Sequence, residues 1–298
     1  MHKLDDPVLL EKCVRIKDMI EKVAADPKRQ QDYYARYHHW QLNPPLELSE
    51  IEKFEDYSGV ELPVEYVYFL TNVGRGGASP GTGLNNFESK WGLDEDINKE
   101  SRQLFYPMSN EEWEQMFDDD ELDDYYYGTV ELCGMDLTYN AYLVVTGPMS
   151  GKIVYLDYGS SLPPMWPKGF PDFLTWYESF FSELISGYDI SPTWKFMWQE
   201  PGNADILISA FQNTMDNEYR KDVLCSFCKF PTLSAKACEF IKGISDPEFQ
   251  DAIKKVLAHF NSNTDKPKPK KRKYPKKETD CLFNKRAEKE NKAPKYRH

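Results

Sequence analysis

Residues 62–84, LPVEYVYFLTNVGRGGASPGTGL, determine how the rest of the chain is organised. They predict a short helix followed by a loop dense in glycine. Pro63 suits the first helical turn, where a backbone N–H is not needed. Val67, Leu70 and Val73 follow at helical spacing and form one apolar stripe. Gly74 is expected to end the helix in a left-handed conformation.

Five glycines crowd the loop after this helix, nearly a third of the 16 in the chain. Such density indicates that the backbone adopts positive φ angles or lies close against another segment. We therefore predict a structural loop built on Gly74, Gly76, Gly77, Gly81 and Gly83.

The same loop contains GASPG at 77–81, which matches the G-x-S-x-G motif of serine hydrolases. In that motif the residue after the serine donates a backbone N–H to the oxyanion hole. Here that residue is Pro80, which has no N–H. A phosphate-binding loop would need a lysine, and this loop has none. The sequence favours a structural turn, and it offers no nucleophile, base and orienting residue that belong together, so no catalytic residues are expected.

The residues around the loop also follow the pattern of a known family. The matching positions are Tyr37, Trp40, NPPL at 43–46, Phe54, Gly59, LP at 62–63, Tyr66, Phe69, the glycine loop through Gly83, LVVTGP at 143–148, Gly151, Phe173, Trp176 and Tyr177. In this order and spacing, the chain resembles the Smi/Knr family of the SUKH superfamily over residues 35–187.

This resemblance implies an α+β domain in which helices pack on a mostly antiparallel sheet. It also implies binding rather than catalysis. Bacterial members of the family are immunity proteins that bind and neutralise a toxin domain, and fungal relatives are cell-wall and signalling scaffolds. We therefore expect a non-enzymatic immunity protein whose partner is a cognate toxin domain. A regulatory scaffold is the alternative.

The pattern of elements divides the chain into four parts. We expect an N-terminal helical segment at 1–45, the SUKH-like domain at 46–190, a helical segment at 191–262 and a disordered Lys/Pro-rich tail at 263–298.

Apolar spacing predicts the individual elements. Helices are expected over 8–39, 173–185 and, as several short ones, 203–261, and strands over 125–133, 141–146 and 153–158. Ser49 with Glu52, and Ser245 with Glu248, predict capping boxes. Gly59 and Gly187 are expected to end helices.

The net charge of −12 combines two opposite regions. Residues 265–298 hold 14 Lys+Arg and 5 Asp+Glu, a net charge of +9, so the preceding 264 residues carry −21. An acidic body repels nucleic acid and attracts basic partners, which suits a basic, nuclease-like toxin. In the scaffold alternative, the basic tail contacts nucleic acid or an acidic partner.

The acidic charge is concentrated at 94–124, where 13 acidic residues meet 2 basic ones. Three tyrosines follow this run, and aromatic residues beside charge are typical of interface hot spots. We predict a partner-binding surface here. Its residues are Asp118, Asp119, Asp120, Glu121, Asp123, Asp124, Tyr125, Tyr126 and Tyr127.

No metal or cofactor is expected. DEDIN at 94–98 begins like a calcium loop, but the glycine and the glutamate that such a loop requires are missing. Cys225 and Cys228 lack a second ligand pair for zinc, so buried apolar thiols are predicted there. His38 is expected to stack beside Trp40. Scattered cysteines and the lack of an apolar run of about 18 residues predict a cytoplasmic protein without a membrane partner.

Overall fold

The structure is a computed structural model that describes residues 3–87, 112, 113, 115, 128–135, 138–157 and 163–263. The chain forms two compact units, Met1–Phe260 and Asn261–His298. Of the second unit, the described residues are 261–263, which end the last helix.

The N-terminal helix α1 (Pro7–Ala25) begins at Asp6, whose side chain accepts hydrogen bonds from the N–H groups of Val8 and Leu9. The region predicted to be helical over 8–39 is divided into separate elements. A 3-10 turn, η1 (Arg29–Gln31), and the short helix α2 (Ala35–His38) follow α1 as separate elements. The reason is Pro27, which disfavours helix at the preceding residue, and Asp26 is extended with φ −82° and ψ 112°.

Helix α3 (Leu48–Ser58) precedes helix α4 (Val64–Asn72). The capping box predicted at Ser49 and Glu52 is wrong, because α3 begins earlier. Glu47 is its cap, and the Glu47 N–H donates to the Glu50 carboxylate over 3.2 Å. Gly59 ends α3 with φ 68°, as predicted.

The three predicted strands are confirmed as one antiparallel sheet in the order β1 (Thr129–Gly134), β2 (Tyr139–Val144) and β3 (Ile153–Asp157). The register shifts between Glu131 and Cys133, so β1 carries a bulge. The turn between β2 and β3 uses positive φ at Gly147 and Gly151. The described fold is therefore α+β, as predicted.

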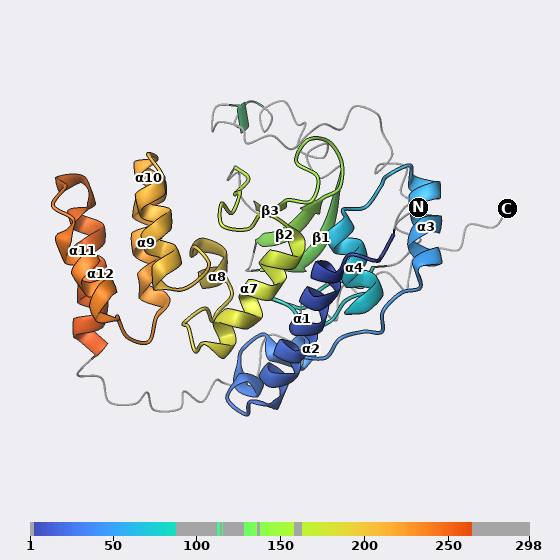
Figure 1. The fold of residues 1–298 in the computed structure, drawn as a ribbon, viewed down its shortest axis with the longest axis horizontal. Helices are drawn as coiled ribbons and strands as arrows, with labels where there is room; N and C mark the ends of the chain where they lie inside the picture. The colour runs from blue at the N-terminus through green and yellow to red at the C-terminus, as the bar shows by residue number, and fades with distance from the viewer. Residues whose placement is uncertain are drawn as a thin grey trace, which may run out of the picture. The chain divides into compact units, whose positions relative to one another are not determined.

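Both faces of the sheet are covered. Because side chains alternate along a strand, Ile153 and Tyr155 join the main core, while Val154 and Leu156 form a second cluster on the opposite face. Helix α7 (Phe173–Ile185) supplies much of the main core, as its apolar stripe predicts. Figure 1 shows α7 beside α1 and α4, and both of these helices contact it.

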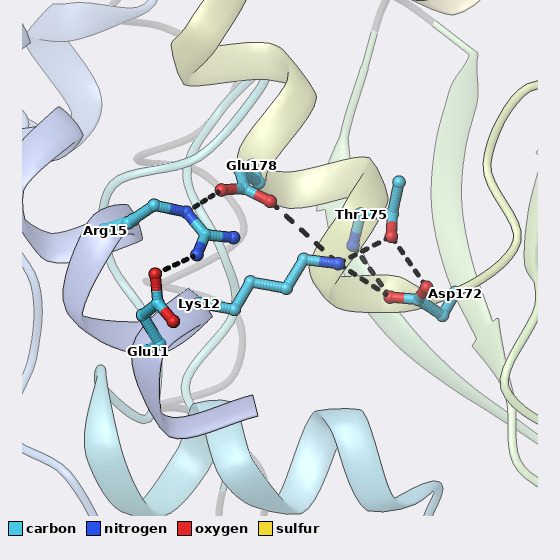
Figure 2. Close-up of polar contacts among 6 residues, drawn as sticks. All are labelled: Glu11, Lys12, Arg15, Asp172, Thr175 and Glu178. Carbon is cyan, nitrogen blue, oxygen red and sulfur yellow. Dashed lines mark hydrogen bonds and ion pairs between the residues drawn. The ribbon is translucent and has the colours of Figure 1, made fainter. Parts of the chain in front are cut away.

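Charged side chains join α1 to α7, as Figure 2 shows. Lys12 Nζ donates to Thr175 Oγ1 over 2.7 Å and lies 3.7 Å from the carboxylate of Asp172, the N-cap of α7. Arg15 Nε donates to Glu178 Oε1 over 3.1 Å. These contacts fix the N-terminal helix to the helix that covers the sheet.

The segment after α7 is helical, as predicted for 203–261. Its elements are α8 (Trp194–Trp198), α9 (Ala204–Asn213), α10 (Asn217–Ser226), η3 (Phe227–Lys229), α11 (Ala235–Gly243), η4 (Pro247–Phe249) and α12 (Gln250–Asn263). They enclose a core of their own around Leu207, Val223 and Phe227. The capping box predicted at Ser245 and Glu248 is wrong, because Asp246 caps η4 and accepts the Glu248 N–H over 2.9 Å. Within the described ranges, no helix is long and apolar enough to cross a membrane.

Candidate functional site

The glycine loop is fixed by backbone hydrogen bonds. Gly77 and Leu84 exchange N–H···O bonds of 2.9 and 2.6 Å, and Thr82 N–H donates to Gly134 O at the end of β1 over 2.9 Å. Gly77, Gly81 and Gly83 have φ angles of 105°, 65° and 102°. These backbone hydrogen bonds therefore hold the loop against the end of β1.

At Gly74 and Gly76 there is no room for a side chain. The left-handed cap predicted at Gly74 is wrong, since α4 ends at Asn72, its C-cap Val73 has a φ of −108°, and Gly74 has no positive φ. A Cβ on Gly74 would lie 2.6 Å from the carbonyl oxygen of Asn43. A Cβ on Gly76 would lie 2.7 Å from Asn86 Oδ1. Close approach of neighbouring chain, rather than backbone conformation, requires these two glycines.

Polar side chains near the loop are turned inward. Ser79 is buried, and its hydroxyl donates to Pro80 O over 2.8 Å. The ring of His38 lies beside that of Trp40, as predicted, with 4.7 Å between their centres, but the rings meet edge-on at 63° and are not stacked. Its Nδ1 accepts the Trp40 N–H over 3.1 Å. Burial, followed by the charge of His39, lowers the pKa of His38 to about 4. Neither side chain is placed to act on a substrate.

The predicted partner-binding residues lie outside the described part of the chain. They are Asp118, Asp119, Asp120, Glu121, Asp123, Asp124, Tyr125, Tyr126 and Tyr127. Within the same acidic segment, Trp113 is described, and it is buried against Tyr142 and Val144 on the second face of the sheet. This contact was not predicted, although a tryptophan among so many acidic residues is a recognisable signal.

The structure places the predicted cysteine pair at the end of α10 and in the turn that follows it. Cys225 lies on α10 and Cys228 in η3, and no group of three or more His, Cys, Asp or Glu residues among those described could hold a metal ion. The predicted burial of both thiols is wrong, because Cys225 is exposed and Cys228 is partly exposed. Cys225 takes an outward position on α10, while Val223 and Leu224 take the inward ones.

A cleft of about 170 Å³ is lined by residues of the loop after β3, of α8 and the turn that follows it, and of α10. Gly169 lets the loop approach, because a Cβ there would overlap the ring of Pro201. Trp198 and Tyr219 contribute aromatic rings, and Lys168, Glu200 and Asp222 contribute charge. An apolar hollow with a few convergent polar groups is typical of a ligand-binding site.

Glu200 is the most firmly held residue of the cleft. Its N–H donates to Ser226 Oγ over 2.8 Å, and its carbonyl oxygen accepts a 2.5 Å hydrogen bond from Lys229 Nζ. Its carboxylate oxygen Oε2 accepts the Tyr219 hydroxyl over 2.9 Å. Burial raises the pKa of Glu200 above its usual value, although the Tyr219 hydrogen bond opposes that shift. Burial also raises the pKa of Asp222.

A buried ion pair adjoins Glu200. Lys229 Nζ donates to Glu183 Oε1 over 2.5 Å, and the Gly202 N–H donates to the same oxygen over 2.8 Å. The two side chains are 0% and 4% exposed. Burial lowers the pKa of Lys229 and raises that of Glu183, and each partner opposes the shift of the other. The pair joins α7 to η3 and thereby fixes the turn that carries Glu200.

The cleft was not predicted either, because its residues come from separate segments and no local spacing connects them. Lys168 and Asp222 share no motif, and the buried pair of Glu183 and Lys229 is recognisable only once the helices are packed. The sequence matches no protein-family model and no curated protein.

Proposed function

We propose that this chain is a non-enzymatic binding protein, an immunity protein of the Smi/Knr type that neutralises a cognate toxin domain. The observation that carries the proposal is the convergence of the residues on which the family resemblance rests. Widely spaced in sequence, they pack in one core. Trp40, Phe54, Leu62, Tyr66, Phe69, Leu143, Phe173, Trp176 and Tyr177 all belong to it. Their common role in one core supports the resemblance as a shared fold.

Individual contacts tie the matching segments together. The ring of Phe69 lies 4.8 Å from that of Tyr177 and 5.1 Å from that of Phe173. The Tyr177 hydroxyl donates to the carbonyl oxygen of Ala78 in the glycine loop. Trp176 Nε1 donates to the Tyr155 hydroxyl on the sheet over 2.8 Å. Helix, loop and sheet therefore depend on the same aromatic residues.

The charge of the body supports a basic partner. Residues 1–264 carry −21, and an acidic surface that resembles nucleic acid in charge would attract a nuclease-like domain. Electrostatic attraction of this kind accelerates association and makes its rate fall with salt. The acidic segment at 94–124 is the proposed contact surface, with the three tyrosines that follow it as anchors.

Co-expression tests the function. The toxin encoded next to this gene is expressed in a sensitive host with and without the full chain, and survival is counted. We expect the chain to restore growth and to co-purify with the toxin. Equal killing in both cultures would refute the proposal.

A charge-reversal experiment tests the contact surface. Asp118, Asp119 and Asp120 are changed to lysine, and association with the purified toxin is followed by stopped flow. The matched control reverses the exposed Asp5, Asp18 and Glu21, which changes the net charge equally. We expect at least a tenfold slower association for the first variant and a smaller change for the control. Equal association rates for the two variants would show that the toxin does not contact the chain at residues 118–120.

A further inference from the structure

We propose that the cleft between the loop after β3 and α10 binds the guanidinium group of an arginine side chain presented by the partner. This inference rests on the proposed function, since it names one chemical feature of the basic partner. Three observations carry it. They are a carboxylate fixed in place, hydrogen-bond acceptors without partners, and an aromatic ring that already holds a cation.

The fixed carboxylate is that of Glu200. Its backbone is held on both sides, by Ser226 Oγ and by Lys229 Nζ, and its Oε2 accepts the Tyr219 hydroxyl. A group held in this way loses little conformational entropy when it binds a ligand. Its second oxygen, Oε1, has no hydrogen-bond partner among the described residues.

Two further acceptors line the cleft. Gln199 Oε1 is buried and has no hydrogen-bond partner among the described residues. The Asp222 carboxylate makes no hydrogen bond or ion pair within the same part of the chain. A buried acceptor without a partner is costly, which applies to Gln199 Oε1, whereas Asp222 is exposed and adds negative charge at the edge of the cleft. A guanidinium group has five N–H donors in a planar fork, and it could satisfy several of these acceptors at once.

Lys168 shows that the aromatic wall accommodates a cation. Its Nζ lies 4.6 Å from the centre of the Tyr219 ring and 2.6 Å from Asp216 Oδ2. Trp198 offers a second aromatic surface and is 53% exposed. Flat rings and carboxylates together favour a planar guanidinium over a compact ammonium group. The charged groups that line the cleft are Lys168, Glu200 and Asp222, a net charge of −1 when all are ionised.

Lys168 is also the internal competitor of an incoming cation. It shares the cleft with the ligand and repels it, so its removal should strengthen binding. Loss of Glu200 should weaken binding. The two substitutions therefore move the affinity in opposite directions, which a site that merely collapses on mutation would not do.

The experiment uses the full chain and N-acetyl-L-arginine amide as the probe. Its uncharged isostere, N-acetyl-L-citrulline amide, is the matched ligand. Binding is followed by the shifts of the tryptophan indole N–H signals in ¹H–¹⁵N NMR spectra, with the signal of Trp198 assigned from the Trp198→Phe variant. We expect millimolar binding of the arginine probe. The citrulline probe should bind at least tenfold more weakly.

Three variants complete the test. Glu200→Gln should weaken arginine binding about tenfold, the loss of one charge-assisted contact. Lys168→Met should strengthen it severalfold. Glu218→Gln removes the same charge from an exposed position of α10 and should leave it unchanged. Equal binding of both probes, or equal effects of Glu200→Gln and Glu218→Gln, would overturn the proposal.

The toxin co-expression assay separates this inference from the proposed function. If the arginine probe binds as described but the chain does not protect against the toxin, the cleft stands and the immunity function fails. If the chain protects and neither the probe nor the Glu200→Gln variant behaves as described, the function stands and the cleft assignment fails.

Discussion

Polar groups are buried in two regions of this chain, and they are compensated by different means. In the glycine loop the buried groups are backbone N–H and C=O, which pair with Leu84 and with Gly134 at the end of β1. Around the cleft the groups are charged side chains, of which Lys229 and Glu183 are buried and Glu200 is partly buried. Lys229 is paired with Glu183, whereas Glu200 has one carboxylate oxygen without a partner among the described residues.

The difference separates structural from functional demands. The backbone hydrogen bonds of the loop with Leu84 and Gly134 are made within its own chain, so its glycines are explained by folding alone. The Glu200 carboxylate is partly buried and only partly paired, and incomplete compensation of a desolvated charge reduces stability. Natural proteins retain such groups mostly where a function requires them. The contrast therefore favours the cleft as a binding site, and four predictions test it.

The largest effect is expected at the buried ion pair. Lys229→Met leaves the Glu183 carboxylate buried without its counter-charge and should lower the free energy of unfolding by up to about 5 kcal/mol. The measurement is urea denaturation at neutral pH. The double variant Lys229→Met/Glu183→Leu is the control, and it should recover most of the loss. A single variant as stable as the wild type would show that this pair does not hold the turn carrying Glu200.

The next largest loss of stability is expected for a substitution in the glycine loop, at Gly81. A Cβ at this position would overlap the carbonyl oxygen of Gly134, and φ is 65°. Gly81→Ala should therefore cost about 4 kcal/mol, from steric overlap together with the left-handed conformation.

Gly187 is the matched control for Gly81. Its φ is 75°, and nothing lies within 4 Å of the position of a Cβ. Gly187→Ala should cost only about 1 kcal/mol, the conformational part alone. Equal losses of stability in the two variants, measured by thermal denaturation, would contradict the close packing of the loop on the sheet.

These two regions also differ in how far the sequence predicts them. The five glycines lie within ten residues, so their density alone indicates a constrained loop, and the stripe of α7 predicts its helix correctly. By contrast, Glu183 and Lys229 are brought together only by the packing of α7 against η3. No local spacing can reveal such a pair, because the partners belong to elements whose relative placement depends on the whole core. The cleft is hidden from the sequence for the same reason.

Helix starts were predictable only in part, also for a physical reason. Glu47 and Asp246 cap their helices in place of the predicted Ser49 and Ser245. Neighbouring acidic and hydroxyl side chains can all accept a backbone N–H, so composition alone does not select among them. Tertiary packing sets the direction of the backbone at the helix start, and this direction decides which side chain becomes the cap.

The third prediction concerns pH and the loop. The pKa of His38 is about 4 in the folded chain, against a usual value of 6.5. Between these values the unfolded chain binds a proton that the folded chain does not. Stability should therefore fall as the pH falls from 6.5 to about 4, by about 3 kcal/mol in total.

Two asparagine variants isolate this contribution. His38→Asn can keep an acceptor for the Trp40 N–H but does not titrate, so its stability should fall less steeply with acid than that of the wild type. His39→Asn is the control, since His39 is exposed and its φ of 51° suits asparagine. Because burial is the larger cause of the lowered His38 pKa and His39 the smaller one, the slope of that control should change much less than that of His38→Asn. Identical slopes for all three proteins would mean that His38 accepts a proton in the folded state.

The smallest effect on stability is expected at Glu200, and its sign is the opposite of that at His38. Burial raises the pKa of Glu200 above the usual 4.5. In the window between 4.5 and the raised value, the folded chain binds a proton that the unfolded chain does not, so this group stabilises the fold as the pH falls. Glu200→Gln should remove that gain. At neutral pH the Glu200→Gln variant should have a free energy of unfolding within about 1 kcal/mol of the wild type, or higher. Glutamine can still accept the hydrogen bond from the Tyr219 hydroxyl, and it carries no charge to desolvate.

The control is Glu218→Gln, which removes the same charge from an exposed position on α10. The free energy of unfolding of both variants is measured by urea denaturation at several pH values, and their difference gives the effect of burial. A loss of more than about 2 kcal/mol at neutral pH would exceed that of a typical hydrogen bond and make Glu200 a structural residue like Lys229. A neutral or stabilising result would show that the chain keeps this carboxylate at some expense of stability. The cleft would then differ from the glycine loop in its response to substitution, since every substitution that crowds the backbone of the loop is expected to lower stability.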